Sequence, residues 1–229
     1  VSGIKNVVIT IGTFDGVHIG HQKIITRLKE SALPTNAETM ILTFYPHPLT
    51  ILFSGDYEIK MLNTQEEKIE LLQKFGIDHL IIHPFTKEFS QLTYTEFIRD
   101  LLINYLKIKK IIIGYNHHFG KDREGSFQKL EELARIYNFE VEKIPAQDID
   151  KVEISSTKIR KALGVGDIKT VNNFLGYEYS IKGKVVHGKG IGEKSCYATA
   201  NIEADDKYKL IPADGVYAVT VKHNNNMFK

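Results

Sequence analysis

Short apolar runs that alternate with amphipathic segments constrain the fold of this 229-residue chain more than any other feature. Most of the runs are rich in β-branched residues and end at glycine or proline, as strands do. They are apolar on both faces, which is typical of parallel strands covered by helices on both sides. The sequence therefore predicts an α/β fold with a mostly parallel sheet. The expected strands cover residues 7–11, 39–44, 79–83, 110–113 and 139–144, the last at an edge because its faces alternate.

The segments between these runs carry helix signals. Thr64–Glu67 and Thr93–Glu96 both have the Thr-x-x-Glu form of a capping box, which satisfies backbone N–H groups at the start of a helix. Helical spacing also follows the first run and recurs over residues 127–137. The first capping box is followed by apolar residues at helical spacing, namely Ile69, Leu71, Leu72 and Phe75.

The stretch Thr13–His21 follows the first strand and predicts a tight turn and a helix start. Such a turn places backbone N–H groups where an anion can bind. His18 and His21 are three residues apart, so both rings can point at one ligand, and this arrangement suits phosphates better than a metal. Histidines at this spacing also occur by chance on exposed helices. Three glycines, Gly12, Gly16 and Gly20, favour a close approach of the backbone to a ligand.

Three other segments carry polar residues at the expected ends of elements. Ser155 and Ser156 form a natural helix N-cap, which alone would explain them; with Arg160 one turn along, they also form an anion site. Residues 114–125 form a glycine-bounded polar loop of a kind that many proteins have. Residues 44–48 leave the sheet, because two prolines cannot continue a central strand.

The runs G-T-F-D-G-V-H-I-G-H and I-S-S-T-K-I-R resemble the HxGH and ISSTxIR signatures of the FMN adenylyltransferase (FAD synthetase) module of bacterial bifunctional riboflavin kinase/FAD synthetases. Residues 44–48 are similar to the family's F-x-P-H-P element, and residues 114–120 to its G-x-N/D-F-x-F-G loop, with His117 where phenylalanine is commoner. The resemblance covers about residues 5–165 and implies a Rossmann-like nucleotidylyltransferase domain.

The resemblance also implies roles for individual residues. The catalytic residues would be His18, His21, Ser156 and Arg160. The nucleotide would be bound by Gly12, Thr13, Phe14, Asp15, Gly20, Gly114, Asn116, Ser155 and Thr157, with Asp15 either structural or a nucleotide contact. The flavin would be bound by Phe44, Pro46, His47 and Pro48.

The C-terminal part resembles the start of the riboflavin kinase β-barrel, through residues 183–192 and Ala198-Thr199-Ala200-Asn201. The resemblance implies that Gly188, Gly190, Thr199 and Asn201 contact Mg²⁺ and nucleotide. Ala198 replaces a usual proline, and Ser195-Cys196 a usual leucine-glycine. We expect an adenylyltransferase domain over 1–170, a linker over 171–181 and a partial barrel over 182–229. The natural protein is expected to continue, and kinase activity is expected only in a complete chain.

The composition is that of a globular protein, with 42% hydrophobic and 25% charged residues. A formal net charge of +2 is too small to indicate a nucleic-acid partner. No apolar run approaches the roughly 20 residues that span a membrane. The single cysteine, Cys196, excludes an intrachain disulfide and fits a reducing compartment, so a cytoplasmic location is expected. The oligomeric state is left open.

The reaction implied by the resemblance is adenylyl transfer from ATP to FMN, giving FAD and pyrophosphate. Riboflavin would be a further substrate of the complete protein. Mg²⁺ would bind the phosphates of ATP, without a protein metal ligand in the adenylyltransferase domain. Two alternatives stay open: a nucleotidylyltransferase for another phosphorylated acceptor, and a catalytically silent module that binds flavin or nucleotide.

Overall fold

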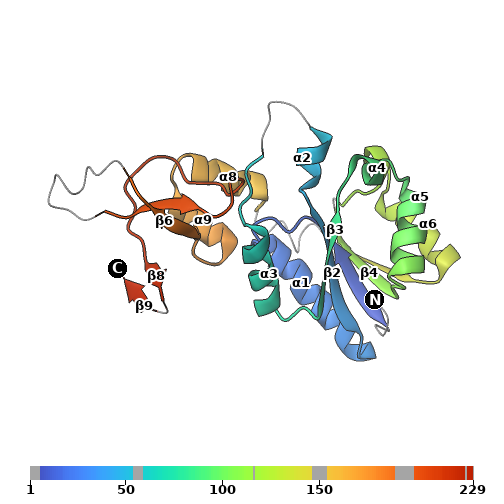
Figure 1. Cartoon of the computed structure of the whole chain (residues 1–229). Coiled ribbons are helices and arrows are strands. Elements are labelled where there is room, and N and C mark those ends of the chain that lie inside the picture. Colours follow the sequence, from blue (N-terminus) through green and yellow to red (C-terminus); the bar gives the residue numbers. More distant parts are fainter. Residues whose placement is uncertain are drawn as a thin grey trace.

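The computed structural model describes residues 6–53, 59–115, 117–145, 154–188, 199–224 and 226–228. Its centre is a five-stranded sheet in the order β3-β2-β1-β4-β5, and all four strand pairs are parallel (Figure 1). The predicted α/β fold is confirmed, and the last strand lies at an edge. The strands are β1 (Val7–Ile11), β2 (Glu38–Tyr45), β3 (His79–Pro84), β4 (Lys110–Gly114) and β5 (Glu140–Ile144).

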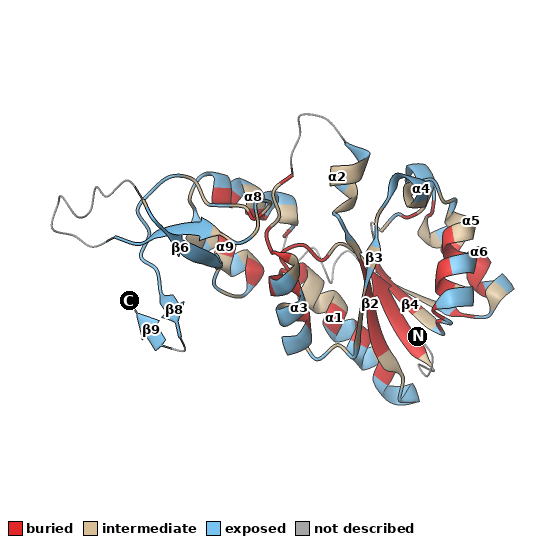
Figure 2. Cartoon of the chain, in the orientation of Figure 1, coloured by how far each residue is buried: buried red, intermediate tan, exposed pale blue. Residues whose placement is uncertain are grey.

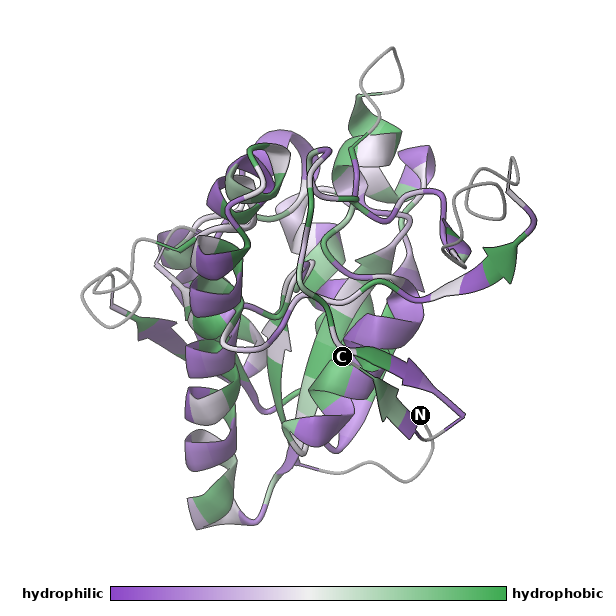
Figure 3. Ribbon diagram, turned by 90° about the vertical axis from the view of Figure 1, so that its left-hand side faces the viewer, coloured by the Kyte–Doolittle hydropathy of each residue, from purple (hydrophilic) through white to green (hydrophobic). Residues whose placement is uncertain are grey.

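Helices cover both faces of this sheet, as two-sided apolar strands require. α1 (Ile19–Ala32) and α3 (Gln65–Lys74) pack on one face, and the π-helix η2 (Phe97–Tyr105) and α6 (Phe127–Tyr137) pack on the other. One cluster of buried side chains includes Val8, Ile41, Ile112, Leu28 and Leu72. The other includes Ile9, Met40, Ile111, Leu102 and Leu130. β1, β2 and β4 are therefore buried (Figure 2) and strongly hydrophobic (Figure 3).

Both predicted capping boxes are present, at Thr64 and at Thr93. The second opens α5 (Tyr94–Glu96), which leads directly into η2. The other short elements lie in the connections: η1 (Leu33–Thr35), α2 (Pro48–Leu52), α4 (Lys87–Ser90) and η3 (Lys121–Arg123).

The apolar pattern that predicts α3 is only partly right about the buried face of this helix. Leu72 is buried, but Ile69 is 39% exposed. The charged residues Glu67 and Lys68 are buried instead, with exposed fractions of 5% and 8%. Helix α3 therefore carries two buried charges near its N-terminus: Lys68 faces the carboxyl ends of β1 and β2, and Glu67 faces Lys209 of the C-terminal part.

A third cluster is built by α8 (Ser156–Gly164) and α9 (Ile168–Leu175). It includes the buried residues Leu62, Ile159, Leu163, Val171 and Leu175. α9 runs through the first residues of the segment 171–181 that the sequence assigns to a linker. The division into domains stays a prediction.

Beyond α9 the chain forms the short strands that the sequence predicts. β6 (Gly183–Val186) pairs antiparallel with β7 (Asn201–Ala204), and β8 (Val221–His223) with β9 (Asn226–Phe228). These hairpins are almost entirely exposed, and they lie at the end of the molecule away from α6 (Figures 1 and 2).

A short segment of the C-terminal part docks beside the N-terminus of α3. The N–H of Met61 donates to the carbonyl of Tyr208 (2.6 Å), and the N–H of Leu210 donates to the carbonyl of Met61 (2.8 Å). Between these bonds the Lys209 ammonium is buried, 2.7 Å from Glu67 Oε2 and 2.8 Å from the carbonyl of Leu62. The C-terminal part is thus tied to the part of the chain that holds the five-stranded sheet by a buried ion pair.

We expect Lys209→Met to lower the free energy of unfolding by about 3–5 kcal/mol, because it leaves the Glu67 carboxylate buried without its counter-ion. The exposed pair Lys182–Glu70 provides the control, and Lys182→Met should cost no more than about 1 kcal/mol. Urea unfolding of both variants measures this. Equal effects of the two substitutions would show that Lys209 is not held by a buried pair.

Candidate active site

The turn between β1 and α1 is wound in an unusual backbone conformation. Phe14, Gly16 and Val17 have positive φ angles of 48°, 83° and 35°. Such angles are costly for residues with a side chain and concentrate at functional sites. A Cβ on Gly16 would lie 2.7 Å from Leu62 Cδ1. The backbone angle and the contact with Leu62 are enough to require a glycine at position 16, and a close approach of the backbone to a ligand stays a prediction.

Asp15 holds this turn from inside the protein. Its side chain is 4% exposed, and Oδ1 accepts from the N–H groups of Leu62 (2.9 Å) and Asn63 (3.4 Å). Oδ2 accepts from the guanidinium of Arg160. Burial raises the pKa of the Asp15 carboxyl, and these donors lower it. A proton on the carboxyl would face donors only, so the pair with Arg160 is ionic.

The ISST helix meets the same turn, so the two predicted motifs come together in space. Ser156 Oγ donates to the carbonyl of Asp15 (2.9 Å), and Ser155 caps α8 by accepting from the N–H of Lys158 (3.3 Å). Arg160 Nε also donates to the carbonyl of Lys60 (2.9 Å). In this structure Ser156 and Arg160 hold the turn, and Thr157 is exposed in the first turn of α8.

His18 and His21 face each other at the start of α1. Their rings stack at a centroid distance of 3.7 Å and an angle of 15°. His18 Nδ1 caps the helix by accepting from the N–H of His21 (3.3 Å), which leaves the proton on Nε2. His21 Nδ1 is buried and has no hydrogen-bond partner among the described residues. One imidazole thus offers an N–H, and the other an unsatisfied nitrogen, to a ligand.

Both histidines are neutral at pH 7. Burial lowers the pKa of His18 to about 4. Burial, with the charges of His18 and Lys68, lowers the pKa of His21 well below its ordinary value. The histidine pair therefore carries no positive charge at pH 7, and its rings are neutral hydrogen-bonding groups.

Lys68, which the sequence pattern did not single out, also lies at this end of the sheet. Its Nζ lies 3.2 Å from the carbonyl of Thr13 and 3.5 Å from Thr43 Oγ1, at the carboxyl ends of β1 and β2. The sequence pattern places Ile69 on the buried face of α3, and its neighbour Lys68 would then be exposed. The available signal was its position four residues before Leu72, which places both on one face of α3.

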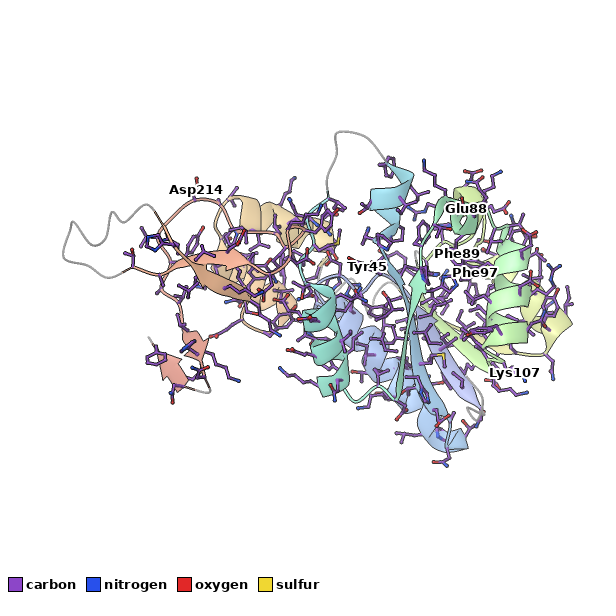
Figure 4. The ribbon with its side chains drawn as sticks, in the orientation of Figure 1. Tyr45, Glu88, Phe89, Phe97, Lys107 and Asp214 are labelled. Carbon is purple, nitrogen blue, oxygen red and sulfur yellow. The ribbon has the colours of Figure 1, made fainter. Side chains whose placement is uncertain are left out.

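The predicted flavin residues lie at the end of β2. His47 Nδ1 caps α2 by accepting from the N–H of Leu49 (3.2 Å), and burial lowers the pKa of His47 to about 4. Phe44 packs against Phe85 and Phe89, at 5.6 and 5.7 Å between ring centroids. Figure 4 shows Phe89 beside Phe97, with Tyr45 at the end of β2. Pro46 follows a cis peptide bond, and Pro48 opens α2.

An open groove of about 520 Å³ lies next to this element, between α2 and α4. Its lining residues are Ile51, Leu52, Lys87, Glu88, Ser90 and Gln91. None of them belongs to the predicted nucleotide or flavin residues, and Phe44 and His47 lie on the adjoining segment.

The remaining nucleotide residues are placed by the sheet and the helix start. Gly12 donates its N–H to the carbonyl of Leu42 (3.1 Å), Gly20 is buried in α1, and Gly114 ends β4. The Phe14 ring packs on His21 at 4.9 Å. Asn116 lies outside the described residues.

Comparisons with known proteins agree with this geometry. Residues 2–158 match the family model of FAD synthetase, and residues 175–229 match that of riboflavin kinase. The chain belongs to the FAD synthetase family. The bifunctional riboflavin kinase/FMN adenylyltransferase of Listeria monocytogenes is 38% identical over 221 residues, which are 96% of this chain and 69% of the relative. The Escherichia coli K12 protein of the same name is 36% identical over 214 residues, 93% and 67% of the two chains.

A crystal structure described as a macrolide-efflux protein from Streptococcus pneumoniae is also similar. It has a TM-score of 0.86 and 30% identity, and the match covers 100% of this chain and 73% of that one. Within the described residues, no helix of this FAD synthetase family member is long and apolar enough to cross a membrane.

Two of the predicted kinase residues, Gly188 and Asn201, lie close together in the described C-terminal part. Asn201 opens β7, and Figure 1 shows β6 beyond α9, on the side away from the five-stranded sheet. A Cβ on Gly188 would lie 1.9 Å from Asn201 Nδ2, so this glycine permits a close approach within the C-terminal part. Gly190 lies outside the described residues.

The low pKa of His18 predicts an acid-sensitive fold. The unfolded chain binds a proton near pH 6.5 and the folded chain only near pH 4, so stability is full above pH 6.5 and falls as the pH drops through this interval. His18→Asn keeps an N-cap and removes the titration. Between pH 7 and pH 5 the variant should lose about 2 kcal/mol less unfolding free energy than the natural sequence. Urea unfolding at pH 7 and pH 5 measures this difference. If the variant and the natural chain lost the same unfolding free energy between these pH values, a buried neutral His18 would be contradicted.

Proposed function

We propose that this chain transfers the adenylyl group of ATP to FMN. An oxygen of the FMN phosphate attacks the α-phosphorus of ATP, and pyrophosphate leaves with the electrons of the broken P–O bond. One observation carries the proposal: the stacked His18–His21 pair at the start of α1, on a turn that Asp15 fastens to α8. The family model over residues 2–158 supports FMN as the acceptor.

The site residues act by positioning and by hydrogen bonding, because phosphoryl-type transfer needs little covalent work from a protein. His18 Nε2–H and the His21 ring donate to phosphate oxygens on which charge develops. Backbone N–H groups at the start of α1 also stabilise negative charge on these phosphate oxygens. We assign Ser156 and Arg160 to holding the turn, since both are bonded to Asp15.

Mg²⁺ enters as part of the Mg–ATP substrate. The described residues contain no group of three or more His, Cys, Asp or Glu side chains that could hold a metal, and the Asp15 carboxylate is already occupied by donors. This fits an ion that keeps most of its waters and binds phosphates directly.

We also propose that a complete form of the protein phosphorylates riboflavin through its C-terminal part, and that the protein works in the cytoplasm without a nucleic-acid partner. The riboflavin kinase model over residues 175–229 and the names of the relatives support the first proposal. The single cysteine and the formal charge of +2 support the second. Gly188, Thr199 and Asn201 are the proposed kinase contacts among the described residues.

FAD and pyrophosphate formed from FMN, ATP and Mg²⁺ test the proposed function directly, with liquid chromatography as the readout. His21→Ala should lower kcat by about 100-fold or more and leave FMN affinity nearly unchanged, because the ring acts on the transferring phosphates.

His79→Ala is the matched control, because His79 lies at the amino end of β3, at the edge of the sheet away from the turn. His79→Ala should keep full activity. The circular dichroism spectra of His79→Ala and His21→Ala should both match that of the natural chain. Equal losses of kcat and FMN affinity in His21→Ala would overturn the role of this ring. A folded natural chain that binds ATP and makes no FAD would point to another phosphorylated acceptor, or to a silent binding module.

A further inference from the structure

The charges around the turn do not balance. Arg160 is neutralised by Asp15, with which it shares a buried ion pair. His18, His21 and His47 bring no charge, because each is neutral at pH 7. Lys68 remains, and no carboxylate of the described residues lies within ion-pair distance of its Nζ.

Two buried lysine ammonium groups lie near the N-terminal half of α3, and only one of them has a counter-ion. Lys209 meets the carboxylate of Glu67 at 2.7 Å and therefore has a counter-ion. Lys68, the next residue along α3, meets only a carbonyl and a hydroxyl, at 3.2 and 3.5 Å. A buried ammonium without a counter-ion is costly, so Lys68 lowers the stability of the free protein unless an anion joins it.

The position of Lys68 points to the chemistry of that anion. Its ammonium lies where β1 and β2 end, the edge at which parallel sheets bind ligands. An ammonium has three N–H donors, and the described residues accept two at most. The Thr43 hydroxyl already donates to the carbonyl of Thr13 (3.1 Å), so these two groups remain satisfied without the lysine.

We infer that Lys68 is a catalytic residue whose ammonium contacts a phosphate of the substrates and supplies a positive charge that no carboxylate of the described residues pairs directly. This inference rests on the proposed adenylyl transfer. The phosphate belongs either to the ATP triphosphate or to FMN, and the test separates the two sources.

Lys68→Met tests the inference, because it keeps an apolar stem and removes the charge. The variant should be at least as stable as the natural chain without ligand, whereas a merely structural lysine would make it less stable. Its kcat for FAD formation should fall by about 100-fold. Its affinity should fall by about tenfold or more for the phosphate that the ammonium contacts, which is measured with Mg–pyrophosphate for the ATP phosphates and with FMN for the flavin phosphate. Lys68→Arg should restore part of both, since it restores the charge.

The control is Lys74→Met, at the exposed last turn of α3, which should change none of these quantities. A selective rise of the Mg–ATP dissociation constant in Lys68→Met assigns the contact to the triphosphate, and a selective rise for FMN assigns it to the flavin phosphate. The inference is overturned if Lys68→Met keeps kcat and its affinities for Mg–pyrophosphate, Mg–ATP and FMN all within about threefold of the natural chain. Calorimetric binding of pyrophosphate needs no turnover. If the natural chain binds it and makes no FAD, the proposed function fails while the phosphate contact of Lys68 can still be measured.

Discussion

The buried carboxylate of Asp15 is the contact on which the site depends. It joins three segments that are far apart in the sequence: the turn after β1, the loop before α3 through Leu62 and Asn63, and α8 through Arg160. The turn itself contains left-handed residues that local interactions would not maintain. Because the same turn leads into the helix start at His18, the carboxylate that fixes the backbone also fixes the direction of the histidine pair.

The distribution of charge follows from this arrangement. Asp15 forms an ion pair with Arg160 and neutralises its charge, and burial keeps His18 and His21 neutral. Lys68 is left as a cation without a counter-ion among the described residues. Next to it, Glu67 accepts Lys209 from the C-terminal part. Adjacent residues of α3 therefore serve two purposes: one faces the proposed phosphate site, and the other ties the riboflavin kinase segment to the loop that bonds Asp15.

Local patterns predicted most of the fold and part of the site. The five strands and both capping boxes were predictable because periodicity, β-branching and cap chemistry act within a few residues. The meeting of the HxGH and ISST segments followed from the family resemblance. The burial of Lys68, the exposure of Ile69 and the engagement of Arg160 by Asp15 depend on contacts between residues as far as 145 positions apart, which no local period encodes. Gly16 was singled out by its residue type alone, and the structure adds that its backbone angle and its contact with Leu62 require a glycine.

The most direct measurement is the rate of FAD formation by Asp15→Asn, with Asp78→Asn as the control. Asp78 accepts two hydrogen bonds from Thr39 at the amino ends of β2 and β3. The control therefore removes a carboxylate charge at the end of the sheet away from the turn. We expect that Asp15→Asn remains folded by circular dichroism and that its kcat/KM falls by about 100-fold or more, while the control stays within about threefold of the natural chain. A folded Asp15→Asn variant that keeps the natural rate would contradict the claim that this carboxylate holds the catalytic turn.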